Sequence, residues 1–180
     1  DISGTGRVNV LSGADVLLSG DNSGFDGENG ALWNVEAGAA VSITRAANLG
    51  ESADVLLNGA LTLRSAVPAE GNVYVWRNAL AGSGNLVVNL SSEAEEFAFG
   101  EPHASDTGRN FTGTVTLGTA TFRLDGPGSG NVRALAQATL ELADGSHAVV
   151  ERGSGQNALG GLTLRGGELD FSCVQHTGAH

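Results

Sequence analysis

The chain has 180 residues, of which 41% are hydrophobic and only 16% are charged. An ordinary globular domain has about 25% charged residues, so the polar surface must be built largely from Asn, Ser, Thr and Gly. Nine Arg and no Lys face 20 acidic residues, which gives a formal net charge of −11. Such a surface repels phosphate backbones and anionic headgroups, and we therefore expect neither nucleic acid nor a membrane surface as a partner.

The sequence contains a single cysteine, Cys173, and no methionine. One thiol cannot form an internal disulfide, which excludes a disulfide-stapled secreted module. No apolar run approaches the roughly 20 residues that span a bilayer. Because the first residue is Asp1, we interpret the sequence as a fragment of a larger protein. The tail, residues 172–180, lacks the sequence pattern of the rest of the chain. We predict that it lies outside the fold and is not part of the native protein.

Short segments that alternate apolar and polar residues recur along the whole chain. In chain order they are 7–11, 41–44, 60–64, 72–77, 85–90, 114–117, 121–124, 139–142 and 161–165. Period-two alternation with turn residues between the segments is the pattern of strands with one buried face. Helical spacing is almost absent, and residues 131–137 form the only helix-tolerant stretch. The sequence therefore predicts an all-β fold.

Internal repetition is the second signal. Gly4–Val10 has a counterpart in Gly82–Val88, and a looser pair links residues 54–59 with 139–145. We interpret residues 93–107, which include an acidic run, as an insertion in the second copy. Asn-Gly and Asp-Gly pairs leave an antiparallel sandwich open as an alternative, because they also form hairpin turns.

Three features favour a solenoid over a sandwich: ladder-like repetition, only 5% aromatic residues, and abundant Asn, Ser and Gly for corners. Gly and Asn adopt the left-handed backbone of such corners at little cost. We predict a right-handed parallel β-helix with coils of roughly 20–25 residues and about seven or eight coils. Residues 1–79 would form one set of coils and residues 80–171 a second set.

A block from Leu80 to Phe171 carries a family resemblance. It contains Gly82-Ser83-Gly84-Asn85-Leu86-Val87-Val88, then Phe111-Thr112-Gly113, and closes with Gly160-Gly161-Leu162-Thr163-Leu164-Arg165-Gly166-Gly167-Glu168-Leu169. In this respect the chain resembles the passenger domains of Gram-negative autotransporters, of the pertactin and AIDA-like kind. Scarcity of cysteine is in keeping with the resemblance, because a disulfide-closed loop would hinder export through a narrow pore; Cys173 departs from it.

The resemblance implies a secreted virulence protein, held at the outer membrane and cell surface by a translocator domain absent from this sequence, or released. It also implies that residues 80–171 act as an autochaperone that assists folding. The expected function is non-enzymatic: passenger folding and secretion, with adhesion to a host-surface protein or glycan, or self-association. The alternative is a carbohydrate-active β-helix enzyme, a lyase or glycosidase, which would need two convergent carboxylates.

Two groups of residues are candidates for an interaction surface. Tyr74 and Trp76 share one face of a predicted strand; facing outward they would form a sugar- or protein-binding platform, and facing inward they would be core. Glu93, Glu95 and Glu96 would form an acidic site or, alternatively, a solvated loop.

We expect no catalytic, cofactor or metal site. His103, Ser105 and Asp106 lie close together in sequence, but a catalytic triad is defined by geometry, and no nucleophile-elbow motif accompanies them. The group Asp21, Asp26 and Glu28 matches no calcium-binding loop.

Overall fold

The computed structural model describes residues 1–26, 30–50, 52–64, 73–92, 94–99, 110–123, 135–151 and 159–172. Its strands form three sheets that run along the molecule. Sheet I contains β1 (Arg7–Val10), β3 (Leu32–Val35), β5 (Asp54–Leu57), β8 (Leu80–Gly82) and β11 (Asn110–Phe111). Sheet II contains β2 (Asp15–Leu18), β4 (Ala40–Ile43), β6 (Ala60–Arg64), β9 (Asn85–Asn89), β12 (Thr114–Leu117), β14 (Thr139–Ala143) and β16 (Gly161–Arg165). Sheet III contains β7 (Val73–Trp76), β10 (Glu96–Phe99), β13 (Ala120–Arg123), β15 (Ser146–Glu151) and β17 (Glu168–Ser172).

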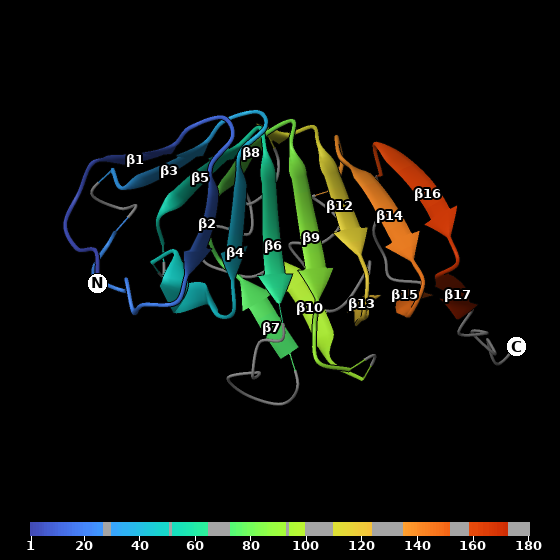
Figure 1. Ribbon diagram of the computed structural model, residues 1–180. Helices are drawn as coiled ribbons and strands as arrows, with labels where there is room; N and C mark the ends of the chain where they lie inside the picture. Colours follow the sequence, from blue (N-terminus) through green and yellow to red (C-terminus); the bar gives the residue numbers. More distant parts are fainter. Residues whose placement is uncertain are drawn as a thin grey trace, which may run out of the picture.

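The chain visits the sheets in turn and pairs each strand with one from the coil before it. Strands β5, β6 and β7 are followed by β8, β9 and β10 in sheets I, II and III, and their pairings are parallel. Figure 1 shows sheet II across the front, from β2 near the N-terminus to β16 near the C-terminus. The predicted all-β parallel β-helix is confirmed.

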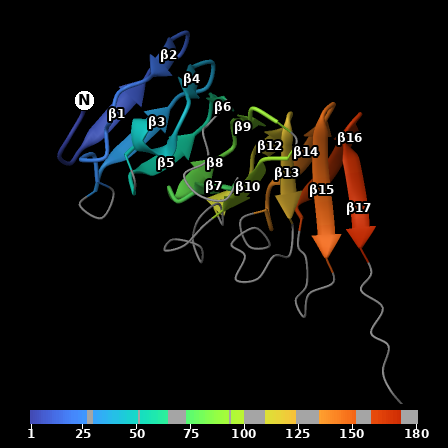
Figure 2. The same cartoon turned by 90° about the horizontal axis from the view of Figure 1, so that it is seen from below.

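Coil length varies more than the sequence predicts. One coil takes 20 residues from Ala40 to Ala60 and 29 residues from Asn85 to Thr114. Sheet II runs through all the coils, whereas sheet I pairs only the earlier coils and sheet III only the later ones (Figure 2). The pairing of β6 with β9 crosses the expected boundary at residues 79 and 80, so the two sets of coils share one continuous sheet.

The apolar residues that alternate along each strand stack on their register partners in neighbouring strands and form rows along the molecule. Because successive residues of a strand point to opposite faces, one residue in two faces the interior. In sheet II the register aligns two inward rows, which we call row 1 and row 2. Row 1 contains Val16, Val41, Leu61, Leu86, Val115, Leu140 and Leu162, and row 2 contains Leu18, Ile43, Leu63, Val88, Leu117, Leu142 and Leu164.

Glycine forms the corner between sheets I and II because the previous coil leaves no room for a side chain. A Cβ on Gly84 would lie 2.2 Å from the carbonyl oxygen of Gly59, and one on Gly113 would lie 2.0 Å from that of Gly84. Backbone hydrogen bonds hold the coils at this separation: the Asn85 N–H donates to Gly59 O at 2.8 Å and the Thr114 N–H to Gly84 O at 3.0 Å. Two glycines of the family-like motifs, Gly84 and Gly113, are therefore corner residues.

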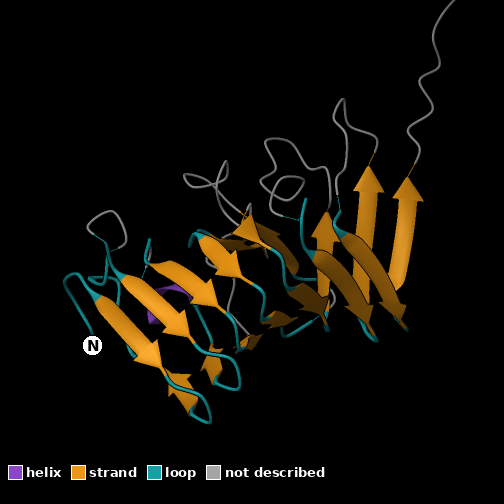
Figure 3. Cartoon of the chain, turned by 90° about the horizontal axis from the view of Figure 1, so that it is seen from above, coloured by secondary structure: helices purple, strands orange, loops and turns teal. Residues whose placement is uncertain are grey.

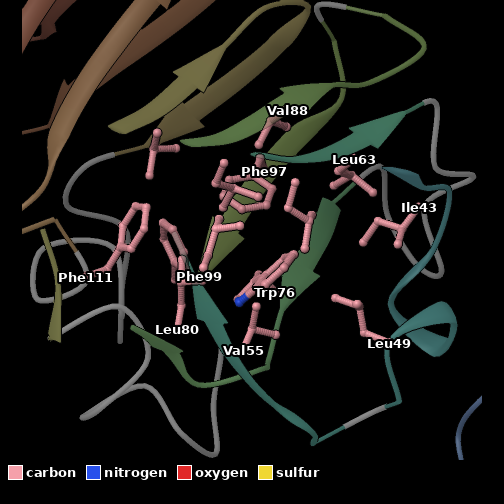
Figure 4. Close-up of a cluster of buried hydrophobic side chains, with 14 of the residues drawn as sticks. Ile43, Leu49, Val55, Leu63, Trp76, Leu80, Val88, Phe97, Phe99 and Phe111 are labelled. Atoms are coloured by element: carbon pink, nitrogen blue, oxygen red, sulfur yellow. The ribbon is translucent and has the colours of Figure 1, made fainter. Parts of the chain in front are cut away.

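Aromatic side chains fill the interior beneath sheet III. Phe97 stacks between Tyr74 and Phe122, with ring centroids 6.1 and 6.2 Å away, and meets Phe99 edge-on at 5.1 Å. Figure 4 shows Trp76, Phe97, Phe99 and Phe111 in one buried cluster with aliphatic residues of the other sheets. The Trp76 indole N–H donates to the backbone carbonyl of Asn78 at 2.7 Å, which satisfies the polar atom of this buried ring.

Buried asparagines tie the first three coils together. The Asn22 side-chain NH₂ donates to Asn48 O at 2.7 Å, and that of Asn48 donates to Gly20 O at 2.7 Å. The Asn78 NH₂ donates to Gly50 O and Ala53 O, both at 2.8 Å. Asn48 lies at the end of a short 3-10 turn, Ala46–Asn48, where its side-chain oxygen accepts the Thr44 and Arg45 N–H groups. The bonds from Asn22 and Asn78 satisfy buried backbone carbonyls that would otherwise be unpaired.

Two expectations about organisation were wrong. Residues 93–107 are not wholly an insertion, because Glu96–Phe99 is strand β10 and pairs with β7 and β13. The repeats predicted from sequence are not structural equivalents either: residues 7–10 lie in sheet I and residues 85–88 in sheet II. The true period is one coil. Among the described residues no helix is long and apolar enough to cross a membrane.

Candidate interaction surface

The predicted aromatic platform is part of the core. Tyr74 and Trp76 do share one face of a strand, β7, but that face points inward, and their exposed fractions are only 6% and 1%. The outward residues of β7 are Val73 and Val75, which are half-buried. Tyr74 and Trp76 therefore cannot form an exposed binding surface, because the coil buries large apolar side chains in its interior in preference to solvent.

The Tyr74 hydroxyl is nevertheless unusual. Among the described residues it is the buried side-chain polar atom with no hydrogen-bond partner. Burial raises the pKa of this phenol far above its ordinary value of 10.0, because the phenolate would lose its hydration.

Glu95 and Glu96 are adjacent in sequence and contribute to local structure. Glu95 accepts a hydrogen bond from the Ser91 N–H at 3.2 Å and another from the Ser91 hydroxyl. Glu96 is the first residue of β10, pairs in register with Val73 and Thr121, and is half-buried. Glu93 lies outside the described residues. The Ser91 contacts make Glu95 a turn-stabilising residue.

The remaining sequence candidates are scattered. Asp21 is exposed, and hydrogen bonds from the backbone N–H and the side chain of Ser23 lower its pKa, with a smaller contribution from Arg45. Asp26 accepts a hydrogen bond from the Ser52 hydroxyl at 2.6 Å. Glu28, His103, Ser105, Asp106 and Cys173 lie outside the described residues. In the described part of the chain no three His, Cys, Asp or Glu side chains are grouped to hold a metal ion.

Small, mostly uncharged side chains cover the outer face of sheet II. Its middle strands present Ser42, Thr62, Val87 and Thr116 in one row. Charge appears toward the C-terminal end, where the Arg165 guanidinium contacts the Glu141 carboxylate at 2.8 Å across neighbouring coils. Arg165 is largely exposed, and an ion pair of this kind contributes at most about 1 kcal/mol.

The last coil exposes residues that elsewhere are core. Leu162 and Leu164 occupy rows 1 and 2, and their partners Leu140 and Leu142 on β14 are fully buried. Leu162 is 43% exposed and Leu164 is 57% exposed. At the other end Val16 and Leu18, which begin the same rows, are half-buried. Figure 3 shows β16 and β17 at one extremity of the molecule, opposite the N-terminus.

The sequence pattern does not distinguish this coil from the others. The Leu-x-Leu pattern of residues 162–164 is the same as that of residues 61–63 and 140–142. Identical patterns give no indication of which copy lies at the end of a stack. The order of the strands was the missing information, since it makes β16 an edge strand.

The fold defines a β-solenoid, and in the described segments its exposed large apolar side chains belong to the first and last of these coils. No family model matches the chain, and no solved structure matches it. Two proteins of Escherichia coli strain K12 are similar to it. The uncharacterized protein YuaQ is 30% identical over 172 residues, which is 96% of this chain and 11% of YuaQ. The uncharacterized lipoprotein YdeK is 31% identical over 168 residues, which is 92% of this chain and 12% of YdeK. The chain thus spans about a tenth of the length of these relatives.

Proposed function

We propose that the chain is a non-enzymatic β-helical segment of an autotransporter passenger, which supports passenger folding and secretion and takes part in adhesion or self-association at the bacterial surface. The observation that carries the proposal is the continuous core beneath sheet II, which runs through every coil of that sheet. Each coil buries its inward residues against the other sheets across the interior and against the coils before and after it. Stability is therefore shared between neighbouring coils.

The family-like motifs occupy structural positions. Gly84 and Gly113 are corner glycines that fit against the carbonyl of the preceding coil, and Leu162 and Leu164 complete inward rows. These positions explain the motifs through coil geometry, with no need for a catalytic role. Similarity to a protein named as a lipoprotein supports a place in the cell envelope. An acidic surface without Lys suits an exported rod that must stay soluble.

A C-terminal folding role follows from the stacking of coils. The coils containing β14 to β17 cover the inward side chains of β12 and β13 through the pairings β12–β14 and β13–β15. Their removal would expose Val115, Leu117 and Phe122, which are fully buried. Burial of a large apolar side chain contributes roughly 1.5–3 kcal/mol to the free energy of unfolding. Exposure of these three side chains would therefore destabilise the coils that precede them.

Deletion of residues 140–171 tests this role. We expect the upstream coils of the truncated chain to be cleaved more rapidly by proteases, with cleavage sites at Arg45 and Arg64. A matched deletion of the first coil, residues 1–19, is the control, because it removes a coil from the other end. Unchanged protease resistance after the C-terminal deletion would refute a folding role for these coils.

A further inference from the structure

Asn58 and Gly59 form the corner between β5 and β6, in the middle of the molecule. Asn58 is exposed and Gly59 is half-buried. The next two coils turn the same corner with Ser83-Gly84 and with Thr112-Gly113. Of the three residues that precede these corner glycines, Asn58 is the one with a side-chain amide. An asparagine followed by glycine is chemically labile, because glycine has no side chain to hinder attack of its nitrogen on the amide carbon.

The packing of the coils requires glycine at position 59. A Cβ on Gly59 would lie 2.3 Å from the carbonyl oxygen of Ala39 and 2.4 Å from that of Glu36. Both oxygens belong to the backbone of the preceding coil and cannot move aside as a flexible side chain could. The fold therefore keeps the residue after Asn58 free of any group that would slow the reaction.

The contacts around Asn58 favour attack on its side-chain carbon. The Ser83 backbone N–H donates to Asn58 Oδ1 at 3.3 Å. A donor at this oxygen stabilises the negative charge that develops there when a nucleophile adds to the amide carbon. The Asn58 and Gly59 N–H groups both donate to the Val35 carbonyl oxygen, at 2.9 and 3.2 Å. Because the Gly59 N–H makes the longer bond to this shared acceptor, the Gly59 nitrogen is the more readily released of the two.

We propose that Asn58 is a site of spontaneous deamidation in the folded protein, with water as the co-reactant. The Gly59 nitrogen loses its proton to solvent and forms a bond to Asn58 Cγ. The bond from Cγ to the side-chain nitrogen breaks, and this nitrogen takes up a proton and leaves as ammonia. The product is a succinimide ring. Water then opens the ring at one of its two carbonyls, which gives aspartate or isoaspartate.

Isoaspartate at this position would lengthen the corner. Its main chain runs through the former side-chain carbons and so gains one methylene group between residues 58 and 59. The Gly59 carbonyl oxygen accepts the Asn85 N–H at 2.8 Å, and a Cβ on Gly84 would lie 2.2 Å from the same oxygen. A longer corner would displace this oxygen. The modification therefore weakens the contact between the coils that contain β6 and β9.

Mass spectrometry of the purified, folded chain after incubation at mildly alkaline pH tests the proposal. Cleavage after arginine releases residues 46–64 as one peptide, which contains both Asn58 and the buried Asn48. Asn58 should convert to a mixture of aspartate and isoaspartate, faster as the pH is raised, while Asn48 keeps its amide. Asn89 is the matched control, because it is exposed like Asn58 but is followed by Leu90, whose side chain hinders ring closure.

Two variants remove the reactive amide and follow the chain's own corners. Asn58→Ser reproduces the corner at Ser83, and Asn58→Thr reproduces the corner at Thr112; circular dichroism establishes that each is folded. Ion exchange separates the modified wild-type chain, which carries one additional negative charge. The fraction that contains isoaspartate in peptide 46–64 should unfold at a lower temperature than unmodified wild type, and neither variant should form it.

Three results would overturn the proposal. In the first, Asn58 keeps its amide in the folded chain under conditions that deamidate the same chain unfolded in urea. In the second, Asn89 converts as fast as Asn58, which would mean that the following glycine has no effect. In the third, the isoaspartate fraction unfolds at the same temperature as unmodified wild type, so that the corner tolerates the longer main chain. The other Asn-Gly pair, Asn29-Gly30, lies in a different peptide and does not interfere with these measurements.

Discussion

Leu140 and Leu162 are register partners on adjacent strands of sheet II, yet Leu140 is fully buried and Leu162 is 43% exposed. The two residues have the same neighbour pattern in sequence and differ only in their place in the stack. A coil in this molecule therefore becomes core only when another coil covers it. In this chain the row residues of β2 and β16 are less buried than those of the strands between them.

Alanine substitution at each of these two positions should lower the free energy of unfolding by very different amounts. Leu140→Ala leaves a cavity in a closed row and should lower the free energy of unfolding by about 2–5 kcal/mol. Leu162→Ala removes a side chain that is already partly hydrated and should cost roughly 1 kcal/mol. Urea denaturation of both variants, followed by circular dichroism at a concentration where the chain is monomeric, measures the difference. Equal costs would mean that Leu162 is covered in solution.

Substitution of a corner glycine should lower the free energy of unfolding by more than its backbone angle alone predicts. In Gly84→Ala the new methyl group would lie 2.2 Å from the Gly59 carbonyl oxygen, so the two coils must separate. Gly13→Ala is the control: Gly13 has a φ of 83°, and a Cβ there would meet nothing within 4 Å. The control should cost about 1–2 kcal/mol for its left-handed backbone, and Gly84→Ala distinctly more. Thermal unfolding of both variants decides between them; a milder effect at Gly84 would contradict the close packing of coils.

The buried asparagine Asn48 should contribute more to stability than a surface one. Asn48→Ala leaves the Thr44 and Arg45 N–H groups without their acceptor and Gly20 O without its donor. These three bonds are part-buried, so water can replace some of them, and we expect a loss of about 1–3 kcal/mol. Asn34→Ala, which loses one surface hydrogen bond to Asn9, should cost under about 1 kcal/mol. Similar denaturation midpoints for the two variants would show that the asparagine ladder is not stabilising.

The single tyrosine allows a clean test of burial by pH. Because the pKa of Tyr74 is raised in the folded state, the unfolded chain releases the phenolic proton first as the pH passes its ordinary value. Stability is therefore fully present below about pH 10 and falls as the pH rises further. The sequence has no Lys and no other Tyr to obscure this range. Tyrosinate absorbance should appear only together with unfolding, whereas ionisation at about pH 10 in folded protein would show that the phenol is accessible.

Tyr74→Phe complements that titration. The substitution removes a buried hydroxyl with no partner among the described residues and keeps the ring that stacks on Phe97. We expect equal or greater stability at neutral pH, by up to about 1–3 kcal/mol, and a weaker decline above about pH 10. Destabilisation of more than 1 kcal/mol at neutral pH would show that the hydroxyl has a partner, such as an internal water, which the variant loses.

The sequence was sufficient for the fold because alternation and corner chemistry are local. Segments such as 60–64, 114–117 and 161–165 carry period-two alternation, and each is a strand of sheet II. The true repeat was harder to find, because coils of 20 to 29 residues keep no fixed period. Strand β10 was missed because its first residue belongs to an acidic run that was interpreted as a loop, although Phe97 and Phe99 alternate correctly.

The candidate site was less predictable than the fold. Alternation places Tyr74 and Trp76 on one face of a strand, but it does not say which face is inside. The aromatic stack with Phe97 decides that question, and it depends on a register that only the coiled arrangement supplies. The exposure of Leu162 and Leu164 likewise depends on strand order, which a single sequence does not encode in any local pattern.

Antibody labelling of intact cells is the most direct test of the proposed function. The full-length polypeptide that contains this chain would be expressed in the organism that encodes it, and antibodies raised against the purified chain would be applied before and after permeabilisation. The proposal predicts strong labelling of intact cells, with little increase after permeabilisation, and loss of the signal when intact cells are treated with protease. Labelling that appears only after permeabilisation would contradict a passenger at the cell surface.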